Sequence, residues 1–77
     1  MMELNRSEQE NNFLSTPIGD LAVTEVFKLR SKLMGFSTIS QILDTDMKLI
    51  TQKEDYSERW YFELVSLLDR NKLLHLI

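Results

Sequence analysis

The sequence of 77 residues contains no cysteine, one proline and two glycines. Without cysteine the chain can form neither a disulfide framework nor a thiolate metal site, so its stability must come from packing. The single histidine, His75, has no second imidazole or thiolate with which to share a metal ion. A chain this short has room for one domain and buries only about 60–65% of its unfolded surface, so we do not expect a deep substrate cavity.

The sequence also lacks a long hydrophobic run. No segment approaches the roughly 20 apolar residues of a membrane-spanning helix, and the N-terminal residues contain no signal-peptide core. We therefore expect a cytoplasmic protein. The net charge of −3 is uneven, since residues 1–12 contain three glutamates and one arginine. Residues 13–77 are nearly neutral, which does not favour nucleic acid as a partner, although a single basic face can still bind a polyanion.

The two parts of the chain differ in composition. Residues 1–12 are polar and contain no aromatic side chain, which predicts a disordered acidic tail. In residues 13–77, apolar residues recur at helical spacing between short polar turns, and strand-like alternation nowhere persists. The sequence therefore predicts an all-α fold, with a single compact domain of four or five helices.

The first predicted helix follows a short N-terminal turn. Thr16 is expected to cap this turn, with Pro17 at its first helical position. Thr24 is the predicted N-cap of a helix over residues 25–34, and Gly35 is the predicted terminator. The buried side of this helix is expected to consist of its large apolar residues, which are Val26, Phe27, Leu29, Leu33 and Met34.

Three further helices are predicted. Ser37 is expected to cap a helix through Leu43, and residues 44–46 to cap a short helix over residues 47–50. Asp55, with Glu58 three residues later, matches a capping box before the longest and most buried helix, which ends near Asn71. The apolar residues 73–77 either fold back over the first and fourth helices or remain exposed as a docking strip; we favour the fold-back.

Several short motifs follow one another in a characteristic order. They are the opening Pro17-Ile18-Gly19-Asp20-Leu21, the cap Thr24, Lys32, the turn into Ile39, the pair Leu49-Ile50, and the closing Glu63-Leu64 with Leu68 and Leu73. In this order the chain resembles the C-terminal domain of the bacterial RNA polymerase alpha subunit, a compact domain of the helix-hairpin-helix kind. Most of the matching positions are structural, so they indicate the fold more than the activity.

This resemblance implies a non-enzymatic, transcription-associated module that binds DNA weakly through backbone and minor-groove contacts. In that family, DNA lies against the start of the first long helix and the hairpin before the last one. The residues of this chain that fall at or near those places are the predicted nucleic-acid-binding residues Lys28, Arg30, Ser57, Arg59 and Trp60.

Other positions depart from the family pattern. Val26 and Leu29 stand where the family has a polar, DNA-contacting arginine and asparagine, and Ser57 replaces the hairpin glycine. These departures raise an alternative, a protein–protein interaction domain that has kept the scaffold and lost the DNA-binding face. Val26, Leu29, Trp60 and the apolar C-terminal segment would then form the contact surface, whereas burial in the core is the competing interpretation of Trp60. Exposure of Val26 and Leu29 would favour a protein partner.

No catalytic residue, metal ligand or cofactor is predicted. The acidic residues Asp44, Asp46 and Asp55 lack the ligand spacing of a calcium loop and are interpreted as caps. Ser37 or Ser57 could act as a nucleophile only beside a general base, and His75 lies in an apolar segment. The expected partner is therefore DNA or, in the alternative, a protein of the transcription machinery, and neither a membrane nor a small-molecule substrate is expected.

Overall fold

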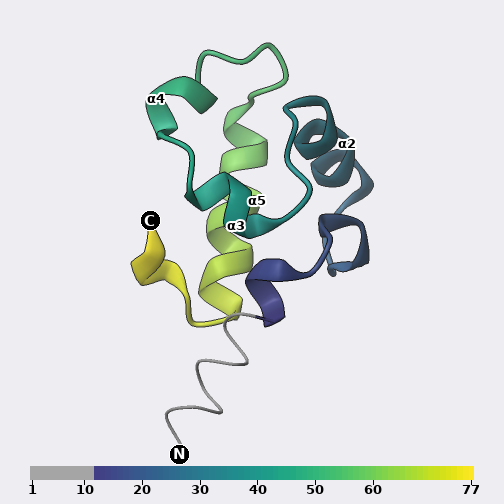
Figure 1. Ribbon diagram of the computed structural model, residues 1–77, viewed down its shortest axis with the longest axis vertical. Coiled ribbons are helices and arrows are strands. Elements are labelled where there is room, and N and C mark those ends of the chain that lie inside the picture. The colour runs from purple at the N-terminus through teal and green to yellow at the C-terminus, as the bar shows by residue number, and fades with distance from the viewer. Residues whose placement is uncertain (1–11) are drawn as a thin grey trace, which may run out of the picture.

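The computed structural model describes residues 12–77 (Figure 1). Its α-helices are α2 (Glu25–Leu33), α3 (Ile39–Leu43), α4 (Met47–Ile50) and α5 (Glu58–Arg70), and its 3-10 helices are η1 (Ile18–Asp20) and η2 (Leu74–Leu76). Residues 12–15 form a further helical turn. The described residues contain no strand, so the predicted all-α class is confirmed. The predicted disordered tail lies, apart from Asn12, outside the described residues.

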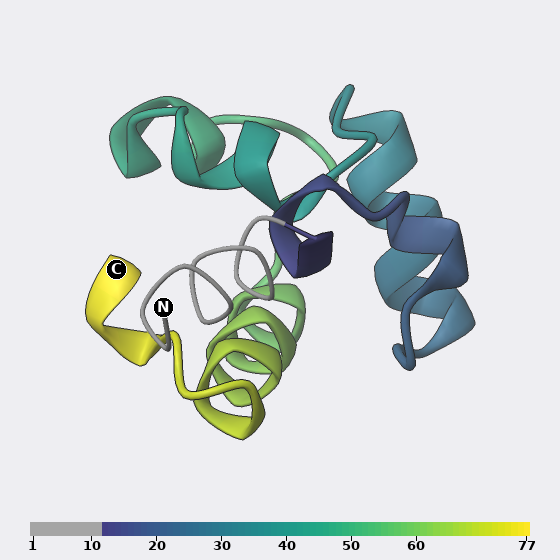
Figure 2. The same ribbon diagram turned by 60° about the horizontal axis from the view of Figure 1, so that its bottom comes forward.

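The helices are arranged around α5. In Figure 1, α5 runs down the centre, with α2 on one side and α4 and the C-terminal turn η2 on the other. Figure 2 shows from another direction that α2 and the α3–α4 pair lie on separate sides of the molecule. Within residues 12–77, none of the helices has both the length and the apolar character needed to cross a membrane.

Trp60 lies in the core, which confirms the interpretation that its ring is buried. The residue is 2% exposed and stacks with Phe27 and Phe36 at centroid distances of 5.7 and 6.5 Å, while Tyr56 approaches the ring edge-on. The Nε1–H of Trp60 donates a 2.9 Å hydrogen bond to Oγ of Ser31, which is fully buried. Because a buried indole N–H needs an acceptor, this bond explains why a polar residue lies on the buried side of α2.

Both ends of α2 form as predicted. At the N-terminus, Oγ1 of Thr24 accepts a 3.1 Å hydrogen bond from the backbone N–H three residues later. At the C-terminus, Gly35 has a φ of +90°, and the N–H groups of Gly35 and Phe36 donate to the carbonyls of Lys32 and Ser31 at 3.0 and 2.9 Å. This is the Schellman pattern, in which glycine adopts the left-handed conformation without strain. It ends the helix and leads Phe36 into the core.

The predicted caps of the N-terminal turn and of α3 are wrong. The hydroxyl of Thr16 donates to the carbonyl of Asn12 instead of capping η1, which has no side-chain cap. The N-cap of α3 is Thr38 and not Ser37: Oγ1 of Thr38 accepts from the N–H of Gln41, whose side chain in turn accepts from the N–H of Ser37. The Gln41 side chain thus provides the acceptor for the Ser37 N–H, and the hydroxyl of the adjacent Thr38 caps the helix.

The long helix α5 also begins at a different cap from the one predicted. Oγ of Ser57 accepts a 3.1 Å hydrogen bond from the N–H of Trp60, so Ser57 is the N-cap and Asp55 is not. The carbonyl of Asp55 instead accepts a 2.9 Å hydrogen bond from the guanidinium of Arg30 on α2. The predicted end of the helix is confirmed, since Asn71 is the C-cap, and so is the prediction that it is the longest helix, with 13 residues.

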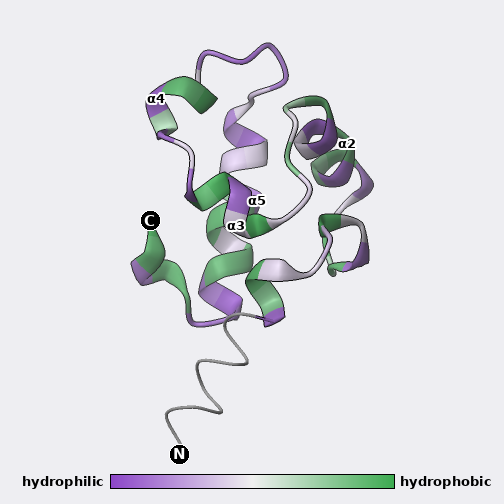
Figure 3. Cartoon of the chain, in the orientation of Figure 1, coloured by the Kyte–Doolittle hydropathy of each residue, from purple (hydrophilic) through white to green (hydrophobic). Residues whose placement is uncertain are grey.

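The C-terminal segment folds back on the α3–α4 side of α5. Leu73 is 2% exposed, and η2 packs against α5 as predicted. Leu76 and Ile77 line a small depression together with Ile42 of α3. The segment thus lies away from α2, which it was also predicted to cover (Figure 1). It is mostly hydrophobic (Figure 3), and Leu74, Leu76 and Ile77 remain 42%, 39% and 48% exposed.

Candidate interaction groove

α2 exposes three large apolar side chains that were predicted to be buried. Val26, Leu29 and Leu33 are 55%, 57% and 58% exposed. Their spacing of three and four residues places them on one flank of the helix, which we name the apolar flank of α2. The prediction that these three residues belong to the core is wrong, whereas the predicted burial of Phe27 and Met34 is confirmed.

The residues that α2 directs into the core are Phe27, Ser31 and Met34. They form a second stripe at helical spacing, on a different side of the helix from the apolar flank. Trp60 accounts for the choice between the two stripes, because its ring stacks on Phe27 and its N–H requires the hydroxyl of Ser31. Burial of the apolar flank instead would leave the indole N–H without this acceptor, at a cost of about 1–3 kcal/mol.

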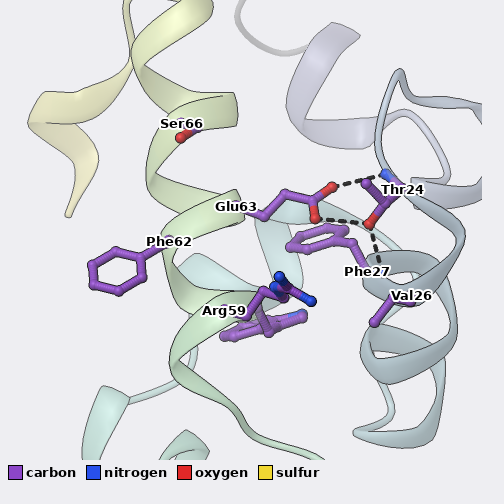
Figure 4. Close-up of a pocket in the computed structure, with 8 residues that line it drawn as sticks. Thr24, Val26, Phe27, Arg59, Phe62, Glu63 and Ser66 are labelled. Carbon is purple, nitrogen blue, oxygen red and sulfur yellow. Dashed lines mark hydrogen bonds between the residues drawn. The ribbon is translucent and has the colours of Figure 1, made fainter.

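A groove of about 380 Å³ lies between α2 and α5 (Figure 4). It is lined by Val26 from the apolar flank of α2 and by Arg59 and Phe62 from α5, with the core rings of Phe27 and Trp60 at its base. Phe62 is 63% exposed, although it belongs to the helix that supplies most of the core. Exposed apolar side chains therefore border the groove on both helices.

Glu63 connects the two helices at one end of the groove. Its Oε2 accepts a 2.8 Å hydrogen bond from the N–H of Thr24, and its Oε1 accepts a 2.7 Å hydrogen bond from the Thr24 hydroxyl (Figure 4). A carboxylate at this position also interacts favourably with the positive end of the α2 dipole. Both oxygens of Glu63 are thus engaged in holding the N-terminus of α2 against α5.

Arg59 is the basic side chain of the groove. It is exposed, and in Figure 4 it lies between Val26 and Phe62. Glu63, four residues later on the same helix, would be its usual helical ion-pair partner, but that carboxylate is turned towards Thr24. Within residues 12–77 the one ion pair formed is between Lys28 and Glu25. The groove therefore presents, beside its apolar surface, a guanidinium that forms no ion pair within residues 12–77.

Most of the residues predicted to contact DNA take part in contacts within the domain. Arg30 donates to the Asp55 carbonyl, Ser57 caps α5, and Trp60 is buried, so its ring is not accessible for stacking on a base. Lys28 forms a 3.5 Å ion pair with Glu25. Of the five predicted residues, Arg59 is the one that combines exposure with a place in the groove.

The residues predicted to form a protein-interaction surface differ in their exposure. Val26 and Leu29 are exposed, whereas Trp60 supports the groove from its base. Leu33 and Phe62 were not predicted to be part of this surface. The sequence contains an indication of exposure for both residues. Leu33 continues the stripe of Val26 and Leu29, and Phe62 lies off the stripe formed by the other apolar residues of α5.

The described residues contain no cluster of three or more histidine, aspartate or glutamate side chains that could hold a metal ion. Comparisons with protein-family models, with curated protein sequences and with solved structures give no match for this chain. The resemblance to the polymerase alpha C-terminal domain therefore stays a prediction. The fold and the groove together define a small all-α domain with an apolar surface groove between two helices.

Proposed function

We propose that this domain binds a protein partner on the apolar flank of α2 and in the adjoining groove between α2 and α5. The observation that carries the proposal is the exposure of Val26, Leu29 and Leu33 on a single flank. A domain of this size has little apolar surface to spare, because its core is small. Three such side chains on one flank, beside the exposed ring of Phe62, are typical of an interaction surface and not of scattered surface residues.

The apolar surface alone supports a modest affinity. Complete burial of one Val, Leu or Phe side chain contributes about 1.5–3 kcal/mol. Since Val26, Leu29, Leu33 and Phe62 are 55–63% exposed, a partner that covers them gains roughly 3–7 kcal/mol in total. Association itself opposes binding by about 4 kcal/mol or more. The apolar contacts alone therefore leave at most about 3 kcal/mol, which is weaker than millimolar binding, so polar contacts must supply much of the affinity.

The test is a selection of peptides from a random displayed library on the immobilised chain, followed by affinity measurements on variants. Leu29→Glu and Val26→Glu are expected to weaken the selected peptides about tenfold or more, because each places a charge against apolar groups. The control is Leu49→Glu on α4, since Leu49 is equally exposed, at 57%, and belongs neither to the apolar flank of α2 nor to the groove lining. Equal losses in all three variants, or no loss in any, would contradict the proposal.

DNA binding of the kind that the resemblance implies is the second candidate. The exposure of the basic side chains Arg59 and Lys32 favours it. The test is an amide-shift titration with a short A·T-rich duplex at low and at near-physiological salt. Shifts in residues 25–30 and 55–60 that weaken as the salt concentration rises would support this function. The absence of shifts at low salt with DNA in large excess would contradict it.

A further inference from the structure

The shape of the groove favours one kind of peptide backbone. The groove is bordered by two helices, and the described residues offer no sheet edge, since their only β-type pairing is the single bridge between Pro17 and Thr38. An extended peptide on this apolar surface would leave backbone N–H and C=O groups without partners. A helix satisfies these groups internally, and helices bind between helices through residues at i, i+3, i+4 and i+7.

The length of the apolar flank fits such a helix. Val26 and Leu33 are seven residues apart, which corresponds to about 10 Å, or two helical turns. Three apolar side chains over two turns of a partner helix cover the same distance. Phe62 also lines the groove, with its exposed ring directed away from α2 (Figure 4), and provides a second apolar contact at the outer rim for the same stripe.

The charge in the groove determines what else the partner must carry. A helix that covers the groove removes water from Arg59, and a guanidinium that loses water without gaining an anion is destabilised. Glu63 holds Thr24 with both of its carboxylate oxygens, and no ion pair joins it to Arg59 within residues 12–77. A carboxylate on the partner would stabilise the covered guanidinium, which can bind it through two parallel hydrogen bonds.

We infer that the partner of the groove is an amphipathic helix whose apolar stripe packs on Val26, Leu29, Leu33 and Phe62 and whose aspartate or glutamate pairs with Arg59. This inference rests on the proposed function and specifies the chemistry of the partner. A basic or uncharged helix of the same apolar pattern binds more weakly, because it leaves the guanidinium covered and unpaired.

The experiment is a selection from a second displayed library of helical peptides of about 16 residues, long enough to form a helix on binding. The positions i, i+3 and i+7 are fixed as leucine and the others are randomised. On the unmodified chain, aspartate or glutamate is expected at one constant position beside the leucine stripe. On Arg59→Glu, lysine or arginine is expected at that position instead. Arg59→Glu should fold normally, since an acidic residue is favourable in the first turn of α5.

The matched control is Arg70→Glu, which reverses an exposed arginine on the same helix outside the groove lining. It should leave the selected sequences unchanged. In affinity measurements, Arg59→Glu is expected to weaken a peptide selected on the unmodified chain about tenfold, and exchange of the peptide's acidic residue for lysine should restore the affinity.

Three outcomes would overturn the inference. Selected helices without a charge preference at any position would contradict the role of Arg59 but leave the proposed function standing. A failure to enrich binders from either library would contradict both. Sedimentation of the chain as a dimer that Leu29→Glu dissociates would identify a second copy as the occupant.

Discussion

α2 and α5 use their apolar residues in different ways. In α5, Trp60, Leu64, Leu67 and Leu68 are buried, and they account for most of the large apolar side chains of the helix. In α2, the buried stripe includes the polar Ser31, while three large apolar side chains are exposed. Folding therefore explains most of the large apolar residues of α5, with Phe62 as the exception, but not those of α2. The apolar flank of α2 requires a second explanation, for which we propose a binding partner.

The largest effect is expected from Trp60 on the buried side of α5. Trp60→Ala removes the ring that contacts Phe27 and Phe36 and should lower the free energy of unfolding by about 3–5 kcal/mol. A loss of this size is enough to unfold many small domains. Phe62→Ala on the same helix is the control, with an expected change within about 0.5 kcal/mol. Urea unfolding followed by circular dichroism measures both, and similar losses would contradict the placement of these two rings.

The next effect concerns the polar residue on the buried side of α2. Ser31→Leu makes the buried stripe of α2 entirely apolar, as is usual for the buried side of a helix. It should nevertheless destabilise the domain by about 1–3 kcal/mol. The added volume enters a packed core, and Trp60 loses its acceptor. Lys32→Leu, an exposed change at the next residue, should have little effect on unfolding. Equal or greater thermal stability in Ser31→Leu would contradict the observed orientation of α2.

A smaller effect is expected where the two helices are joined. Thr24→Ala removes the N-cap hydroxyl and its bond to Glu63, and we expect a loss of about 1 kcal/mol in unfolding free energy. Thr24→Ser keeps the hydroxyl and should retain most of the stability. Chemical unfolding of the two variants separates the hydroxyl from the methyl group, and equal losses would show that the hydrogen bonds contribute little.

The smallest effect on stability is expected from the apolar flank. Leu29→Gln replaces an exposed side chain with one of similar helix propensity, so the free energy of unfolding should change by less than about 0.5 kcal/mol. Met34→Gln, on the buried stripe at the C-cap of α2, should cost about 2 kcal/mol or more. A large loss in Leu29→Gln would place the apolar flank in the core and remove the basis of the proposed function.

The same contrast shows what the sequence could predict. The C-terminal end of α5 was predicted correctly. Most of its buried residues form a single apolar stripe, and this stripe stops where Asn71, a strong helix terminator, follows. The helix α2 was also found, with Thr24 and Gly35 at its ends, but its orientation was not. Its apolar residues form two stripes, and the choice between them depends on Trp60, which lies 29 residues further along than Ser31.

The caps show a similar limit. Ser37 and Thr38 are adjacent and can both start a helix, as can Asp55 and Ser57 two residues apart. Other side chains engage the residues that do not cap, since Gln41 accepts from the Ser37 N–H and Arg30 donates to the Asp55 carbonyl. In the candidate site, the exposure of Val26 was raised as a criterion for a protein partner. The engagement of Glu63 by Thr24, which leaves Arg59 without its helical partner, could not be read from spacing alone.

The most direct test of the proposed binding surface is an amide-shift titration of the labelled chain with a peptide selected on it. The account predicts shifts concentrated in residues 24–33 and 59–66, on the two sides of the groove, and their loss in Leu29→Glu. Shifts concentrated instead in residues 42–50 and 73–77, around the depression beside η2, would contradict it and would move the binding surface to the C-terminal side of the domain.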